Sequence, residues 1–212
     1  MGNLFRPDSP LMRFMMMITN LVVLNVLWLL CCIPIVTAGA STVAMHTVLL
    51  GYLNKKDDAV VKPFFRAFRE NFRGVTPLWL MNFLIAAVMV AEIFYLSVGA
   101  ETWLKVVFGI LLFIYGAATS YLYPLMARYQ SSKKQAILNS FMLSLRHFLS
   151  SLCVVTLNGL PIFLLVAFPA IFWKTILFWT VIGFSLIAYL DLKILMPVFK
   201  RYESPDDREE TL

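Results

Sequence analysis

Three asparagines lie inside long apolar stretches of this chain, where hydrogen-bonding side chains are rare. They are Asn25, Asn82 and Asn158. An amide surrounded by hydrocarbon has no water to bond, so it must face a polar partner on a neighbouring helix or in a cavity. Two interpretations follow. The amides either join helices, at about 0.6–2 kcal/mol each, or form a polar layer that lines a path for a solute or an ion.

A break in the first apolar stretch is the second candidate site. The segment Pro34-Ile-Val-Thr-Ala-Gly-Ala-Ser-Thr42 combines a proline, a glycine and three hydroxyl groups. Ser41 or Thr42 is expected to cap the helix that follows, since these residue types accept hydrogen bonds from the first free amides. Discontinuous helix starts bind anionic or hydroxyl-rich groups in several transporters. We therefore take Thr37, Gly39, Ser41 and Thr42 as a candidate helix-start site, and a tight turn outside the cytoplasm as the alternative.

The remaining polar groups do not indicate catalysis. Asp191 lies near the inner end of the last apolar stretch, where we expect it to pair with Arg128 or a cytoplasmic lysine rather than to relay protons. The three cysteines, Cys31, Cys32 and Cys153, show no metal-ligand spacing. Phosphate-binding, zinc-protease and serine-hydrolase motifs are missing from the sequence. We expect a protein that is not an enzyme and that uses no metal or cofactor.

The elements that position these residues must be membrane-spanning helices. The chain is 60% hydrophobic and 14% charged, whereas soluble domains are about 25% charged. The forty-one residues from Phe14 to Asn54 contain no charged side chain, and about 20 apolar residues suffice for one crossing. Hydropathy predicts helices at about 14–36, 41–53, 75–96, 103–126, 149–172 and 175–199. The expected fold is an all-α membrane protein, a six-helix bundle in a single domain over 1–212.

Charge places both termini in the cytoplasm. With six crossings, sixteen of the eighteen Lys and Arg residues fall on one side, and only Lys105 and Lys174 on the other. The crossings form hairpins at about 14–53, 75–126 and 149–199. The second helix has thirteen residues and spans roughly 20 Å, so a half-helix is the alternative. The cytoplasmic parts are the amphipathic connections 55–73 and 127–148 and a short polar tail, 203–212.

The connection 55–73 carries an aromatic stripe beside a basic one. Its docking candidates are Phe65, Arg66, Phe68, Arg69, Phe72 and Arg73. Such a helix is suited to a membrane surface with anionic lipids; docking of a partner subunit is the sharper alternative. Because the basic residues accompany membrane spans and no nucleic-acid motif is present, nucleic acid is not an expected partner.

The last two hairpins resemble each other. Asn82 and Asn158 each follow a phenylalanine by ten residues and are 76 residues apart, and Pro124-x-x-x-Arg128-Tyr129 matches Pro197-x-x-x-Arg201-Tyr202 at an offset of 73. Asn25 is one residue out of step with this pattern. We expect a parallel repeat of helical hairpins that enter and leave from the cytoplasm.

Three segments carry distinctive motifs: Asn25-Val-Leu-Trp28-Leu-Leu-Cys-Cys-Ile-Pro34-Ile-Val-Thr37-Ala-Gly39-Ala-Ser41-Thr42, Arg66-Ala-Phe68-Arg69-Glu-Asn71-Phe72 and Pro124-Leu-Met-Ala-Arg128-Tyr129. Together they resemble the YesL family of bacterial integral membrane proteins, whose function is unknown. The resemblance implies a multi-pass protein of a Gram-positive-type bacterial plasma membrane. Genes of this family often lie beside those for carbohydrate ABC importers and sensor kinases. This implies an accessory or regulatory subunit for carbohydrate uptake, whose partners are transporter subunits or a second copy of the chain. A small solute transporter or channel lined by the asparagines is the alternative.

Overall fold

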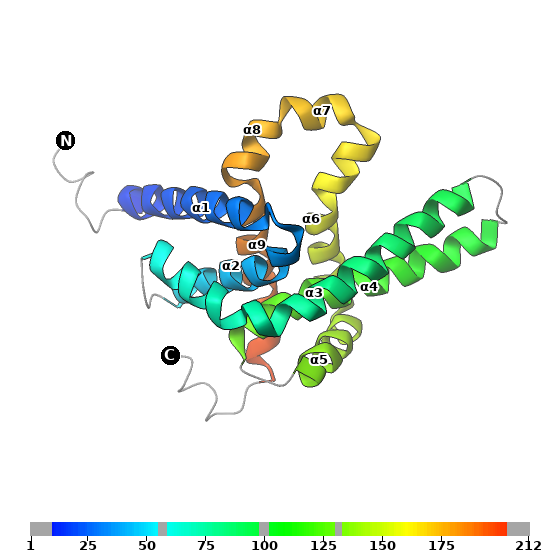
Figure 1. Cartoon of the computed structure of the whole chain (residues 1–212), viewed down its shortest axis with the longest axis horizontal. Helices are drawn as coiled ribbons and strands as arrows, with labels where there is room; N and C mark the ends of the chain where they lie inside the picture. Colours follow the sequence, from blue (N-terminus) through cyan, green and yellow to red (C-terminus); the bar gives the residue numbers. More distant parts are fainter. Residues whose placement is uncertain (1–9, 55–58, 98–101, 130–132, 203–212) are drawn as a thin grey trace.

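The chain is built almost entirely from helices. The computed structural model describes residues 10–54, 59–97, 102–129 and 133–202, and no β-strand occurs in these ranges. Figure 1 shows the helices in chain order. Their bounds are α1 Pro10–Cys32, the 3₁₀ turn η1 Ile35–Thr37, α2 Ala38–Leu53, α3 Val61–Ser97, α4 Thr102–Arg128, α5 Lys133–Arg146, α6 Phe148–Ala167, α7 Pro169–Lys174, α8 Ile176–Phe178, the π-helical turn η2 Trp179–Gly183, and α9 Phe184–Lys200.

Six helical segments of the described ranges are long and apolar enough to cross a membrane, as the sequence predicts. They are Leu11–Cys32, Ile35–Leu53, Val61–Glu92, Trp103–Arg128, Phe148–Ala167 and Ile176–Lys200. A multi-pass membrane protein follows from their number, length and composition. The polar tail 203–212 lies outside the described residues.

The second span is longer than the thirteen residues expected from the sequence. The helix α2 begins at Ala38 and the 3₁₀ turn η1 extends it back to Ile35, which makes a span of nineteen residues. The break between the first two spans is therefore narrow, because α1 ends at Cys32 and η1 begins at Ile35. The sequence placed the helix start too late because Gly39 reads as a helix breaker, although it lies inside the first turn of α2 and is buried there.

The helix α2 forms the centre of the molecule. It packs against α1, α3, α4 and α9, and ten of its sixteen residues are buried. It contributes Leu49 to the largest apolar cluster, which also contains Leu24 of α1, Phe64 of α3 and Leu192 of α9. A helix that is apolar on every side is typical of such a central position.

The amphipathic residues 61–73 do not form a separate helix at the membrane surface. They are the first part of α3, which continues without interruption to Ser97 over thirty-seven residues. Residues 55–58 of the predicted connection lie outside the described residues. Pro63 lies in the first turn, where a proline removes no helical hydrogen bond. The second predicted connection, 127–148, contains the helix α5, Lys133–Arg146, and its residues 130–132 lie outside the described residues.

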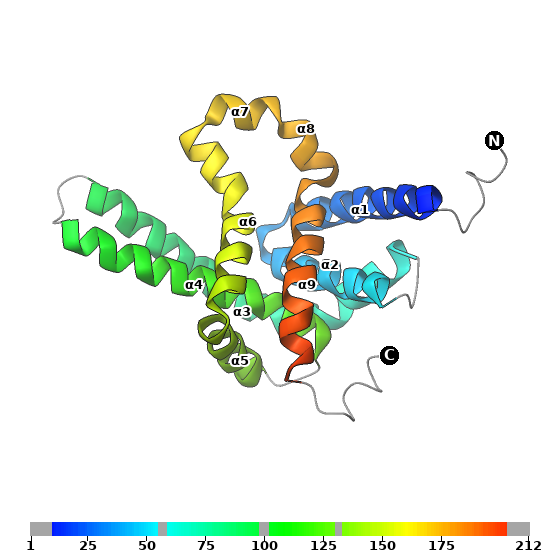
Figure 2. The ribbon, with the colours of Figure 1, turned by 180° about the vertical axis from the view of Figure 1, so that it is seen from behind.

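The three hairpins diverge from the centre instead of forming a compact bundle. In Figure 1 and in the reverse view of Figure 2, the α3–α4 pair projects to one side, and the α6–α9 pair rises as an arch closed by α7 and α8. Apolar side chains such as Leu84 on α3 and Val166 on α6 are therefore 65% and 77% exposed. Hydrocarbon chains solvate such side chains as well as a neighbouring helix does, so nothing forces the hairpins together along their whole length.

Candidate functional site

Asn25 holds the distorted start of the last span. Its side chain is fully buried; its Nδ2 donates to the carbonyls of Trp179 and Thr180 at 3.1 and 2.8 Å, and its Oδ1 accepts from the backbone N–H of Ser185 at 2.9 Å. The π-helical turn Trp179–Gly183 changes the register of the helical hydrogen bonds at this point. The amide of Asn25 pairs the backbone groups that this change leaves available, which is a structural role.

Asn82 joins the two helices of the α3–α4 hairpin. Its side chain is 9% exposed. The hydroxyl of Tyr115 donates to the backbone carbonyl of Asn82 at 2.7 Å, and Asn82 Nδ2 donates to the hydroxyl of Tyr123 at 3.4 Å. The sequence did not single out either tyrosine.

Asn158 is the exception to the expectation that all three asparagines face the interior. Its side chain is exposed on α6. The Nδ2 group donates to the carbonyl of Val154 at 2.9 Å and to Oδ2 of Asp191 on α9 at 2.6 Å. Most of α6 is uncovered because few helices pack beside the arch, and this explains the exposure.

The three asparagines therefore bond to three different places. Among the described residues no hydrogen bond joins one member of the set to another. Two of them bond to a residue that lies 33 positions further along the chain: Asn82 to Tyr115, and Asn158 to Asp191. The offset of 76 that relates Asn82 to Asn158 also relates Tyr115 to Asp191. That offset was the signal in the sequence that could have identified Tyr115.

Asp191 is a buried carboxylate next to a single amide. It is 3% exposed, and its Oδ1 has no hydrogen-bond partner in the part of the chain that the structure describes. A charge in mid-membrane costs about 3 kcal/mol or more, and one hydrogen bond to a charged group returns about 1.5–3 kcal/mol. The two energies are of similar size, so neither charge state of this carboxyl group is strongly excluded.

The expected ion pair of Asp191 is not formed. Among the described residues the one ion pair within 4 Å joins Arg66 and Glu70, at 3.9 Å. Arg128 Nη1 lies 2.8 Å from the sulfur of Met196, and Lys193 Nζ lies 4.8 Å from the centre of the Tyr189 ring. The prediction was wrong because the sequence shows where Asp191 lies along its helix, but it does not show toward which neighbour the side chain projects.

The hydroxyl groups of the Pro34–Thr42 break bond within the first hairpin. Thr37 occupies the N-cap position of α2 but makes no capping bond with its side chain; its hydroxyl donates to the carbonyls of Cys31 and Pro34. Ser41 Oγ donates to the carbonyl of Trp28 at 3.2 Å, and Trp28 Nε1 donates to Thr42 Oγ1 at 3.1 Å. The prediction that Ser41 or Thr42 caps the helix is wrong, because both lie inside α2.

Gly39 belongs to a helix contact. A Cβ atom on Gly39 would lie 2.5 Å from Cβ of Trp79 on α3. The indole of Trp79 also donates from Nε1 to the carbonyl of Ile35 at 2.7 Å. The break thus packs against α3 by the contact of Gly39 with Trp79, two residues that lie forty positions apart in the sequence.

The docking candidates form an exposed surface at the start of α3, which we call the basic–aromatic surface; it consists of Phe65, Arg66, Phe68, Arg69, Phe72 and Arg73. Phe65 is 44% and Phe72 37% exposed, and the three arginines are exposed beside them. Phe68 is half-buried against the central cluster. The opposite face of the same helix is buried through Phe64 and Ala67 and holds the helix on the molecule.

The helix α5 presents its apolar side chains outward. Its buried residues are all small: Ala136, Ser140 and Ser144. They allow α5 to pack closely on α4, and the exposed side includes Leu138 and Met142, at 62% and 66%. This orientation is the opposite of that of a soluble amphipathic helix and fits a helix in contact with a membrane.

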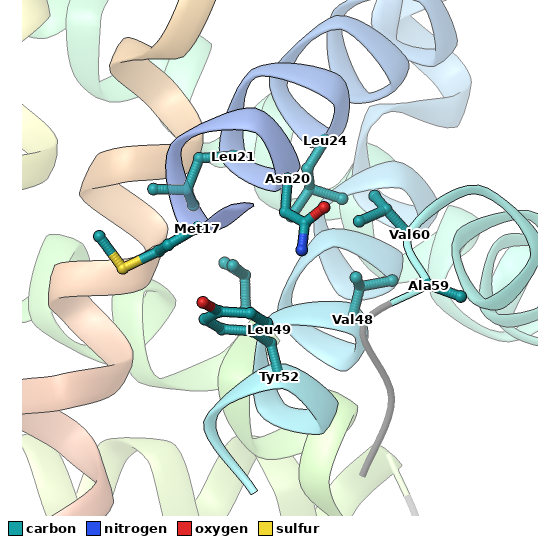
Figure 3. A pocket seen from close by; sticks show the side chains of 9 residues that line it. All are labelled: Met17, Asn20, Leu21, Leu24, Val48, Leu49, Tyr52, Ala59 and Val60. Atoms are coloured by element: carbon teal, nitrogen blue, oxygen red, sulfur yellow. The ribbon is translucent and has the colours of Figure 1, made fainter. Parts of the chain in front are cut away.

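A small pocket lies between α1 and α2, bordered also by the residues just before α3. Figure 3 shows its lining, in which Asn20 and Tyr52 contribute polar atoms among aliphatic side chains. The cavity volume is about 10 Å³, which is the space for about one water molecule. It has no room for a sugar or another solute of that size.

Comparison with known protein families finds a match for one part of the chain. Residues 21–93 match the family model described as "Protein of unknown function, DUF624". The DUF624 segment contains Asn25, the Pro34–Thr42 break, the basic–aromatic surface and Asn82, and it extends from α1 through α2 into α3. No curated protein and no solved structure matches the chain. The six apolar helices indicate an integral membrane protein, and the description of the matching family assigns it no function.

Proposed function

We propose that this chain is a non-enzymatic accessory or regulatory subunit of carbohydrate ABC uptake systems, and that it docks through the basic–aromatic surface. The observation that carries the proposal is the exposure of Phe65 and Phe72 beside Arg66, Arg69 and Arg73. Exposed aromatic and arginine side chains are the types that contribute most to protein interfaces. The resemblance to the YesL family supports the choice of transporter.

The surface is well prepared for docking because its helix is held rigidly. Phe64 is fully buried and Ala67 is 4% exposed on the opposite side of the same turns. The helix is also continuous with the apolar span of α3, so its position relative to the bilayer is defined. Anionic lipid headgroups are a second ligand of the same arginines.

Co-purification tests this proposal. The tagged full-length chain is extracted from its native membranes in mild detergent, and the neighbouring transporter subunits are identified by mass spectrometry. Arg69→Gln with Arg73→Gln is expected to lose these subunits, whereas the matched double variant Lys105→Gln with Lys174→Gln removes two charges elsewhere and is expected to keep them. Recovery of the unaltered chain as a lone monomer would contradict the proposal.

We further propose a bacterial plasma-membrane location with both termini in the cytoplasm. The charge distribution supports this orientation, since sixteen basic residues fall on one side with six crossings. A reporter that is active only in the cytoplasm, fused at either terminus, is expected to be active. Activity at one terminus alone would mean an odd number of crossings.

We also infer a parallel repeat of the second and third hairpins. The equal spacing of 33 residues from Asn82 to Tyr115 and from Asn158 to Asp191 supports it, because corresponding residues of a repeat are expected to meet corresponding partners. An experimental structure in which α3–α4 superimposes on α6–α9 at the offset of 76 tests the inference. Superposition at an offset other than 76, or other than the 73 that relates Pro124 to Pro197 at the end of the hairpins, would contradict it.

A further inference from the structure

Asp191 lies among buried apolar residues of its own helix. The residues one turn before and after it, Ala188 and Leu195, are 3% and 0% exposed, and the adjacent Leu192 is fully buried. One carboxylate oxygen, Oδ2, accepts from Asn158 at 2.6 Å. The other, Oδ1, is buried without a partner among the described residues. A buried polar atom without a partner is rare in proteins and requires an explanation.

We propose that Asp191 is an intramembrane proton-binding site, in which Oδ1 takes up the proton while Asn158 holds Oδ2. The carboxylate form is stabilised by the amide of Asn158, and the acid form is stabilised by the apolar surroundings. The group therefore exchanges its proton with the medium instead of remaining in one state. This inference goes beyond the docking proposal and does not depend on it.

No neighbouring charge holds Asp191 permanently ionised. On α9 itself, Lys193 lies over the Tyr189 ring at 4.8 Å. On α4, Arg128 lies against Met196, and on α2, His46 Nδ1 lies 2.8 Å from the carbonyl of Thr42. Asp191 forms no ion pair within the described residues. The other titratable or charged groups on the described parts of the helices around α9 are Arg13, Cys31 and Cys32 on α1, Tyr52 on α2, Cys153 on α6, Lys105, Tyr115, Tyr121 and Tyr123 on α4, and Lys200 on α9.

The ligand chemistry favours a proton over a metal ion. Hard cations require several oxygen ligands, whereas the nearest side-chain neighbour of Asp191 presents the N–H of Asn158. Within the described ranges no group of three or more His, Cys, Asp or Glu residues could hold a metal. A single free carboxylate oxygen is enough for a proton.

Asn158 also provides the approach to the buried carboxyl group. Its side chain is exposed on α6 while its amide contacts Asp191. The helices α6 and α9 form the two legs of the arch and pack against each other below its closed end (Figure 2). A membrane-soluble reagent can reach Asp191 from the uncovered side of α6 after a small movement of one side chain.

Carbodiimide labelling of the full-length protein in liposomes tests the proposal. Dicyclohexylcarbodiimide partitions into the membrane and reacts with a protonated carboxyl group: the acid proton moves to a carbodiimide nitrogen, and the carboxyl oxygen bonds to the central carbon. Mass spectrometry of the unaltered chain then locates the label. We expect label at Asp191 that decreases as the pH is raised from mildly acidic to mildly alkaline.

Three variants sharpen the test. Asp191→Asn is expected to lose the label, and Glu92→Gln, which removes a carboxyl group near the other end of a span, is expected to keep it. Asn158→Leu removes the hydrogen bond to the carboxylate, so the midpoint of the labelling curve should move to higher pH by about one to two units.

Three outcomes would overturn the proposal. Absence of label at Asp191 at every pH would show that the carboxyl group is never protonated or never reached. Labelling that does not change with pH would show a permanently protonated structural acid. Protection by sodium ions, with choline as the control, would identify a cation site instead.

Discussion

Gly39 and Trp79 bring α2 and α3 so close together that no side chain fits between them. A Cβ atom on Gly39 would lie 2.5 Å from Cβ of Trp79, and this Trp79 atom cannot move without its backbone. Close approach through a glycine is a common way to pack membrane helices, where van der Waals contact replaces the hydrophobic effect as the driving force.

Gly39→Ala is therefore expected to destabilise the protein by about 1–3 kcal/mol, the usual cost of overpacking. Gly51→Ala is the matched control in the same helix, because a Cβ there meets nothing within 4 Å. It should stabilise α2 by up to about 1 kcal/mol through helix propensity. The unfolding midpoint in detergent measures both effects. Equal midpoints for the two variants would contradict the close contact.

Asn25→Leu is expected to lower the free energy of unfolding by roughly 2–5 kcal/mol, since three hydrogen bonds at about 0.6–1.7 kcal/mol each are lost. The loss should be greatest at the π-helical turn, which the amide of Asn25 supports. Hydrogen exchange at Ser185 reports on that turn directly. Asn139→Leu, at an exposed position of α5, serves as the control and should change stability by less than about 0.5 kcal/mol.

Because the apolar side of α5 faces outward, we expect substitutions on its two sides to act in the opposite way from those on a soluble helix. Ser140→Leu, at a position 2% exposed, is expected to weaken packing on α4 by about 1–3 kcal/mol. Leu138→Ser, at a position 62% exposed, should leave the folded state intact but weaken binding to liposomes. Thermal unfolding in detergent and liposome flotation separate the two effects. The reverse result would mean that α5 is rotated.

His147 is expected to make stability depend on pH. Burial is the main cause that lowers its pKa below the usual 6.5, and Arg201 and Arg146 lower the pKa further. The unfolded chain therefore binds a proton before the folded chain does, so stability falls as the pH drops below about 6.5 and is unaffected above it. His147→Gln should remove this part of the pH dependence. Unfolding midpoints of both proteins across the acidic range measure it, and identical slopes would contradict the prediction.

The sequence by itself determined the class of the molecule. Charge-free stretches such as 14–54 are long enough to cross a bilayer, and this physical requirement is independent of how the helices pack. The same reasoning located four of the six spans closely. It also identified the surface residues Phe65 and Phe72, because amphipathic spacing is a local property of a helix.

Only the tertiary structure decided which partner each polar group has. Asn25, Asn82 and Asn158 look alike in the sequence, but they bond to a π-helical turn, to two tyrosines and to Asp191. Gly39 looked like a helix breaker, whereas it serves a contact with Trp79. Such outcomes depend on the direction of side chains and on how the hairpins cross. In a membrane, the direction of the side chains and the crossing of the hairpins are governed by close contacts between residues that are distant in the sequence, and hydropathy does not record such contacts.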